Sequence, residues 1–109
     1  MFDLGCRKDW WNLAPTAKGA VKAGIPAMEI PKNVNEILRD GGVDDKEIDG
    51  IVWSHWHFDH TGDPSLFPES AELWVGPGFK EKFMPGFPES KDSPVLESDF
   101  KYASCTDLS

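Results

Sequence analysis

The chain has 109 residues, of which 39% are hydrophobic and 12% aromatic, so it can form one small domain and is not expected to be globally disordered. Its formal net charge of −8 and its scattered Lys and Arg residues argue against a nucleic-acid partner and against a membrane-binding patch. No apolar run approaches the about 18 residues that cross a bilayer, and the first residues lack the pattern of a signal peptide. We therefore expect a soluble, cytoplasmic protein, and the sequence leaves its oligomeric state open.

The first predicted elements are a short strand over residues 2–5 and a connector over residues 15–32, which is rich in proline and glycine. Residues 17–23 of the connector can contain one helical turn. Two adjacent tryptophans, Trp10 and Trp11, lie between them. Their side chains either form part of an apolar wall near a ligand entrance or pack in the interior, which is the more common fate of tryptophan.

A helix is predicted to begin directly after Asn33, because Asn33 and Glu36 have the spacing of a capping box. A Gly-Gly pair at residues 41–42 ends this helix. An apolar, β-branched run over residues 51–54 then predicts a short buried strand. The apolar residues of the helix fall on one face at helical spacing: Val34, Ile37 and Leu38.

All three histidines of the chain follow this strand within six residues, and an aspartate stands between the second and the third. Imidazole and carboxylate groups are preferred ligands of zinc-type ions, so His55, His57, Asp59 and His60 are candidate metal ligands. Residues two apart in an extended chain point to the same side, so His55 and His57 can reach one ion together. Asp59 and His60 follow the turn out of the strand and can hold a second ion; two ions about 3.5–4 Å apart can share a hydroxide.

The remaining segments predict a further alternation of short helices and strands, which is typical of a layered α/β arrangement. They are a helical turn over residues 64–68, a strand over residues 72–75, a short helix over residues 79–84 and a loop rich in Pro, Gly and Ser over residues 85–94.

The pattern His-x-His-x-Asp-His resembles the signature of the metallo-β-lactamase superfamily of metal-dependent hydrolases. Residues 2–5, Phe-Asp-Leu-Gly, resemble the family's early strand that ends in Asp-x-Gly, and residues 34–62 resemble its helix, turn, strand and metal loop. The segment His-Trp-His-Phe-Asp-His-Thr-Gly-Asp most resembles the branch of N-acyl homoserine lactonases and similar fungal lactonase or lactamase proteins.

The resemblance implies an α/β (α+β) fold, namely about one half of the family's four-layer αββα sandwich. Complete members of the family are considerably longer, and this chain resembles their N-terminal half. We therefore expect residues 1–100 to form a partial metallo-β-lactamase domain and residues 101–109 to form a divergent C-terminal tail.

The resemblance also implies a reaction, the hydrolysis of a small-molecule lactone, lactam or related ester by metal-bound hydroxide, with two Zn²⁺ ions in a complete site. His55 and His57 would hold the first ion, and Asp59 and His60 would hold the second. Asp59 would also be catalytic, because it can receive or pass on a proton for the leaving group. Asp3 either orients a metal-bound histidine or ends its strand by binding local backbone N–H groups.

The number of ligands leaves a second interpretation open. A catalytic zinc site usually has three protein ligands and one open position, whereas His55 and His57 supply two. In the family the further ligands come from downstream sequence that this chain lacks. The chain is therefore either part of a metal-dependent hydrolase or a truncated, non-catalytic remnant with weak or no metal binding.

Overall fold

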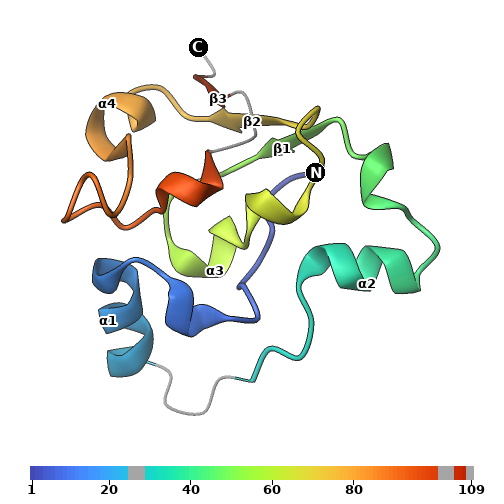
Figure 1. Cartoon of the computed structure of the whole chain (residues 1–109), viewed down its shortest axis with the longest axis horizontal. Helices are drawn as coiled ribbons and strands as arrows, with labels where there is room; N and C mark the ends of the chain where they lie inside the picture. The colour runs from blue at the N-terminus through green and yellow to red at the C-terminus, as the bar shows by residue number, and fades with distance from the viewer. Residues whose placement is uncertain (25–28, 101–104, 108–109) are drawn as a thin grey trace.

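The computed structural model describes residues 1–24, 29–100 and 105–107 (Figure 1). Short helices surround a three-stranded parallel sheet in the order β1-β2-β3, which confirms the predicted α/β class. In Figure 1 the three strands lie side by side, and α1 and α2 lie beyond the edge of the sheet that β1 forms. Within the described residues no helix is long and apolar enough to cross a membrane.

The sheet consists of β1 (Gly50–Val52), β2 (Glu72–Val75) and β3 (Cys105–Asp107). The predicted strand over residues 2–5 is replaced by two isolated bridges, one from Phe2 to Val52 at the end of β1 and one from Gly5 to Thr61. The physical reason is that Asp3 and Gly5 have φ angles of 56° and 66°, which interrupt an extended chain.

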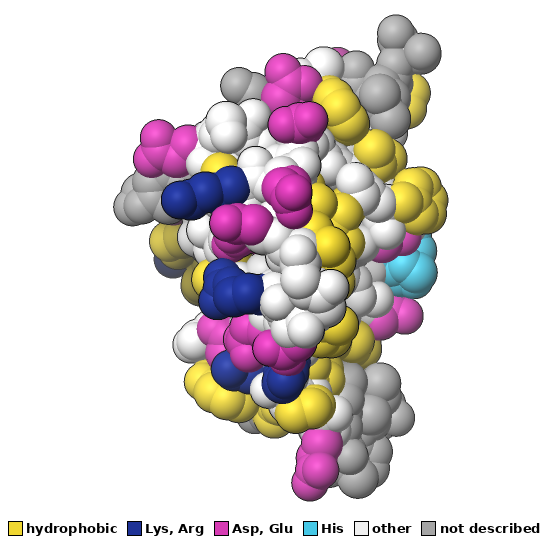
Figure 2. All heavy atoms as spheres, turned by 90° about the vertical axis from the view of Figure 1, so that its right-hand side faces the viewer, with side chains coloured by type: hydrophobic (Ala, Val, Ile, Leu, Met, Phe, Trp, Pro, Cys, Tyr) yellow, Lys and Arg dark blue, Asp and Glu magenta, His cyan; other side chains and the backbone are white. Residues whose placement is uncertain are grey.

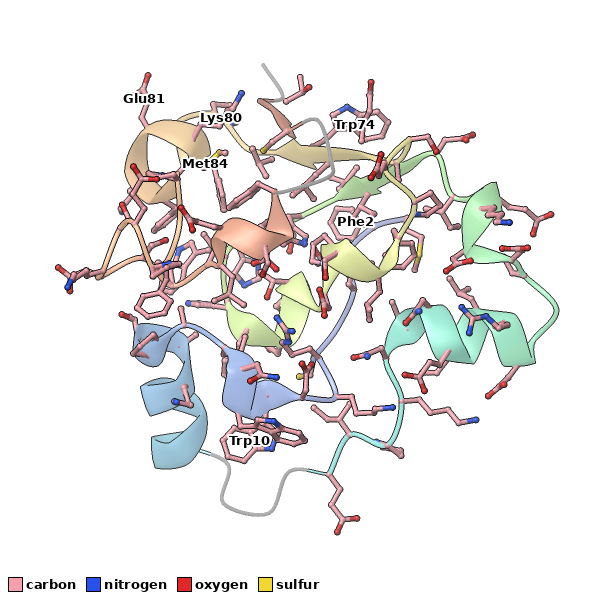
Figure 3. All side chains as sticks on the ribbon, in the orientation of Figure 1. Phe2, Trp10, Trp74, Lys80, Glu81 and Met84 are labelled. Atoms are coloured by element: carbon pink, nitrogen blue, oxygen red, sulfur yellow. The ribbon has the colours of Figure 1, made fainter. Side chains whose placement is uncertain are left out.

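The two faces of the sheet differ sharply in burial. On one face Ile51, Leu73 and Val75 are at most 1% exposed and form the centre of the hydrophobic core. The other face carries a row of four residues in register, one from the N-terminal segment and one from each of the three strands. None of these four residues is fully buried. We call this row the outer row: Phe2, Val52, Trp74 and Thr106. Figure 3 shows Phe2 and Trp74 on the segments that flank β1.

The helices are α1 (Pro15–Gly24), α2 (Val34–Asp40), α3 (Phe58–Thr61) and α4 (Phe79–Phe83). Short 3-10 turns lie at Trp10–Asn12, Asp45–Glu47, Pro64–Leu66 and Glu97–Asp99. The first part of the predicted connector over residues 15–32 is α1, which is longer than the one helical turn expected within residues 17–23. Proline is compatible with the first helical position, and the segment is rich in alanine. Residues 25–28 of that connector lie outside the described residues.

The start of α2 is where predicted, but its capping differs. Asn33 makes no side-chain capping bond; instead its Oδ1 accepts the backbone N–H of Lys8 at 2.7 Å. The Lys8 ammonium also pairs with Glu36 at 3.1 Å. Both residues of the predicted capping box therefore dock the beginning of α2 against the N-terminal segment.

The predicted tail over residues 101–109 lies partly outside the described residues, which include only Cys105–Asp107 of it. These three residues form β3 and pair in parallel with β2, so that Leu73 lies opposite Cys105. The division of the chain at residue 100 stays a prediction.

Candidate metal centre

The segment that carries the histidines is fixed at both ends; we call residues 54–60 the histidine loop. Trp53, which is 2% exposed, donates its indole N–H to the Thr61 carbonyl at 3.0 Å and so joins the residues on either side of the loop. The backbone N–H of Leu4 donates to the His60 carbonyl at 2.9 Å. The loop is thus a closed Ω-like turn held on the core and on the N-terminal segment.

The three imidazole rings lie together within this loop. The ring centroids of His55 and His57 are 4.7 Å apart, and those of His55 and His60 are 4.1 Å apart. β1 ends at Val52, so His55 and His57 lie beyond the strand, and their proximity comes from the bend of the loop rather than from strand alternation. A histidine side chain reaches the surface next to acidic and hydrophobic side chains (Figure 2).

Asp3 is the polar group at the base of this cluster. Its carboxylate accepts the backbone N–H of Ser54 at 2.7 Å and the Ser54 hydroxyl at 2.6 Å, and it lies 2.9 Å from His60 Nδ1. Burial opposes ionisation of this carboxyl, but the hydrogen bonds from Ser54 and His60 outweigh it and hold the pKa of Asp3 below its usual value. Asp3 therefore contacts a candidate ligand directly and also binds a backbone N–H group, so its contacts agree with both roles considered for it.

The donor atoms in the loop suit a divalent cation in type and partly in spacing. His60 Nε2 lies 3.5 Å from Asp59 Oδ2. Two ligand atoms at about 2.1 Å from one ion, at the tetrahedral angle, are about 3.4 Å apart, so this pair has the separation of two zinc ligands. Among the described residues, however, no group of three or more His, Cys, Asp or Glu side chains is arranged to hold an ion. The loop thus offers pairs of ligands rather than a closed site.

Two cavities flank the histidine loop, each of about 360 Å³, and Trp56 lines both. The first is mostly apolar and is lined by Thr16, Ala17, Trp56, His57, Phe58 and Asp59. The second is bordered by His55 and by residues of α4, including Lys82. A small molecule in either cavity would lie against at least one imidazole.

Trp10 and Trp11 do not line either of these cavities. They border a separate one with Lys8, Glu29, Ile30 and Pro31, and Trp10 packs against the small apolar cluster of Leu13 and Ala17. A larger cavity of about 760 Å³, next to Arg7 and Phe100, contains none of the candidate metal ligands. The expected aromatic wall near the histidines is therefore formed by Trp56 and Phe58 instead.

Sequence reasoning missed two residues that shape the centre, Ser54 and Trp53. Ser54 contacts both Asp3 and His55, and Trp53 closes the loop. A hydroxyl residue directly before the first histidine was a visible signal. The bond from Trp53 to Thr61 was not, because it joins a side chain to a backbone carbonyl eight positions away.

A comparison with protein families identifies the family of this chain. The model of the metallo-beta-lactamase superfamily matches residues 1–73, which is more than half of the chain and includes all four candidate ligands. The chain belongs to the metallo-beta-lactamase superfamily.

Several fungal proteins are similar to most of this chain. The gamma-lactamase FDB1 of Fusarium pseudograminearum (strain CS3096) is 53% identical over 98 residues, which is 90% of this chain and 24% of that protein. The gamma-lactamase MBL2 of Gibberella moniliformis (strain M3125 / FGSC 7600) is 43% identical over 98 residues, 90% of this chain and 41% of that protein. The metallo-hydrolase mfmC of Annulohypoxylon moriforme is 41% identical over 102 residues, 91% of this chain and 27% of that protein.

The chain therefore spans less than half the length of each of these curated relatives. No solved structure matches the chain significantly.

Proposed function

We propose that the chain carries part of the active site of a metal-dependent hydrolase that opens a lactam, a lactone or a related ester. The observation that carries the proposal is the gathering of three imidazoles and one carboxylate in a single exposed loop of a metallo-beta-lactamase superfamily member. Imidazole and carboxylate groups are the ligands that zinc-type ions prefer, so a bound cation explains their gathering better than packing does.

In this proposal the four loop residues act as two pairs. His55 and His57 would hold one Zn²⁺ ion and Asp59 with His60 would hold a second, which agrees with the ring proximity and with the 3.5 Å separation of the second pair. The ions would polarise the substrate carbonyl and supply the nucleophile. Asp59 would also be the catalytic carboxylate, because its side chain is half exposed and a carboxylate oxygen can accept a proton and return it to the leaving group.

The substrate class is supported by the cavity next to His57 and by the relatives. The cavity is mostly apolar, and its ionisable lining residues are His57 and Asp59, which suits a small neutral molecule with one polar carbonyl group. Two relatives are named gamma-lactamases, so we propose a lactam before a lactone or an ester.

A second function is favoured by one specific observation. The described residues contain no group of three ligand side chains arranged around a common point, whereas catalytic zinc usually has three protein ligands. In this alternative the chain binds metal weakly or not at all and has no activity of its own.

Metal binding and turnover by the purified chain distinguish the two. We expect Zn²⁺ titration by calorimetry and Co²⁺ absorption to detect nitrogen ligation in the native chain. His57→Ala should weaken binding by more than about 100-fold, whereas Glu69→Gln, which changes an exposed carboxyl outside the loop, should not. Hydrolysis of a lactam should require the metal and be lost in His57→Ala. A chain that takes up no metal and hydrolyses nothing would instead establish the second function.

A further inference from the structure

Four polar side chains, one from the N-terminal segment and three from the histidine loop, form a continuous chain of hydrogen bonds. The Ser54 hydroxyl lies 2.6 Å from Asp3 Oδ2 and 2.8 Å from His55 Nδ1. The same carboxylate oxygen lies 2.9 Å from His60 Nδ1. One aspartate thus contacts His60 directly and His55 through a serine.

The donors in this chain can be assigned by counting protons. An ionised carboxylate only accepts hydrogen bonds, so the single proton of the Ser54 hydroxyl must point to Asp3. The Ser54 oxygen can then only accept from His55, and Nδ1 of His55 must carry a proton. By the same reasoning Nδ1 of His60 must donate to Asp3. A neutral imidazole has one N–H, so both rings keep a lone pair on Nε2.

The third histidine lacks this restraint. Within the described part of the chain no hydrogen bond reaches a ring nitrogen of His57, whose ring instead packs edge-on against Trp56 with centroids 4.4 Å apart. His57 therefore serves as an internal control for His55 and His60.

We propose that Ser54 is a positioning residue that, together with Asp3, sets His55 and His60 in the same tautomer, with the proton on Nδ1 and the lone pair on Nε2. The tautomers follow from the hydrogen bonds alone; their use, the presentation of two ready Nε2 ligands to a cation, rests on the function proposed above. Ser54 lies at an exposed position, where water competes for its hydrogen bonds, whereas the Asp3 side chain is 14% exposed. His60 should therefore hold its tautomer more strictly than His55.

The tautomers can be measured without metal. Long-range proton–nitrogen correlation spectra of the ¹⁵N-labelled, chelator-treated chain, at a pH of about 8 where imidazole is neutral, distinguish protonated from unprotonated ring nitrogens. We expect protonated Nδ1 in His55 and His60 and a mixture in His57. In Ser54→Ala, His55 should shift toward the Nε2–H form while His60 keeps its tautomer, and Ser54→Thr should restore His55. Ser70→Ala, an exposed serine outside the loop, should change neither.

Two results would overturn the inference: His55 protonated on Nε2 in the native chain, or a His55 tautomer that does not respond to Ser54→Ala. Measurements of zinc affinity test whether the tautomers serve metal binding. If the native chain binds Zn²⁺, Ser54→Ala should bind it about 10-fold more weakly, and Ser54→Thr should not. Absence of zinc binding with the expected tautomers would contradict the proposed function and leave the positioning role of Ser54 standing.

Discussion

Asp99 is the residue with the most unusual electrostatic environment in the described chain. It is 5% exposed, its Oδ2 accepts the backbone N–H of Leu96, and its Oδ1 has no hydrogen-bond partner. Burial raises the pKa of Asp99 to about 7; the nearby Asp63 carboxylate acts in the same direction, while the Leu96 amide and Arg7 oppose it. This carboxyl group is therefore neutral in weak acid.

The stability of the fold should consequently fall as the pH rises past the pKa of an unfolded aspartate. The folded state binds the proton of Asp99 more tightly than the unfolded state does, so its contribution is complete below about pH 4 and is lost by about pH 7. The total effect is on the order of 4 kcal/mol. Chemical denaturation between these pH values measures the free energy of unfolding of the native chain and of Asp99→Asn. The free energy should fall with rising pH in the native chain but not, through this group, in the variant.

The exposed Asp92 gives a matched control, and Asp92→Asn should follow the native pH profile. Parallel profiles for the native chain and Asp99→Asn would mean that the Asp99 carboxyl is solvated rather than buried.

The candidate ligands could be predicted from the sequence, whereas the residues that contact them could be predicted less well. His55, His57, Asp59 and His60 stand so close in the chain that any compact loop must bring them near one another. The contact from Asp3 to His60 spans 57 positions, and only the parallel pairing of residue 2 with β1 brings it about. Such pairing depends on the folded topology, which a local pattern does not encode.

Among the elements, the end of α3 is the most sterically constrained. Gly62 follows α3 with φ 52° and ψ −137°, and a Cβ atom at this position would lie 2.4 Å from the Cβ of Leu4. The N-terminal segment can therefore pack directly on the histidine loop only because residue 62 has no side chain.

We expect Gly62→Ala to destabilise the fold by about 2–5 kcal/mol, because it combines backbone strain with a clash inside the core. Gly76→Ala is the control, since a Cβ there meets no atom within 4 Å and should change the free energy of unfolding by less than about 1 kcal/mol. Thermal and urea denaturation measure both. Equal stability of the two variants would show that the N-terminal segment does not pack on the loop as described.

Some helices and strands could be predicted from the sequence more accurately than others. β2 and α2 were located correctly because their apolar residues follow the periods of strand and helix. α1 was predicted too short, as one helical turn at most, because Pro15 and the glycines of its segment suggested a connector. The Asn33–Glu36 pair had the spacing of a cap, but the Lys8 backbone and ammonium compete for the same oxygens.

At the scale of the whole molecule, the described residues leave one side of the sheet incompletely covered. Parallel sheets are normally packed on both faces, yet in the outer row Phe2 is 71% exposed and Thr106 is exposed as well. Trp74 is half-buried partly because its ring lies over Gly50, where it occupies the space of a missing side chain. A face of this kind is expected to bind apolar surfaces.

We therefore expect the isolated chain to bind a hydrophobic fluorescent dye and to self-associate with rising concentration. Phe2→Ser should lower dye fluorescence and association with little loss of stability, because most of the Phe2 side chain is already in water. Ile37→Ser, which changes a residue that is 56% exposed on α2 and outside the outer row, should have a smaller effect. Fluorescence titration and sedimentation velocity measure the two properties. Identical behaviour of both variants would mean that the outer row is not a binding face.

The bond between the Trp53 indole and the Thr61 carbonyl has a consequence for how this protein can vary. It sets the number of residues that fit between those two anchors, whether or not a cation is present. An insertion or deletion there would break the closure even if every imidazole were retained. The spacing of the histidines is thus a property of the scaffold as much as of the chemistry.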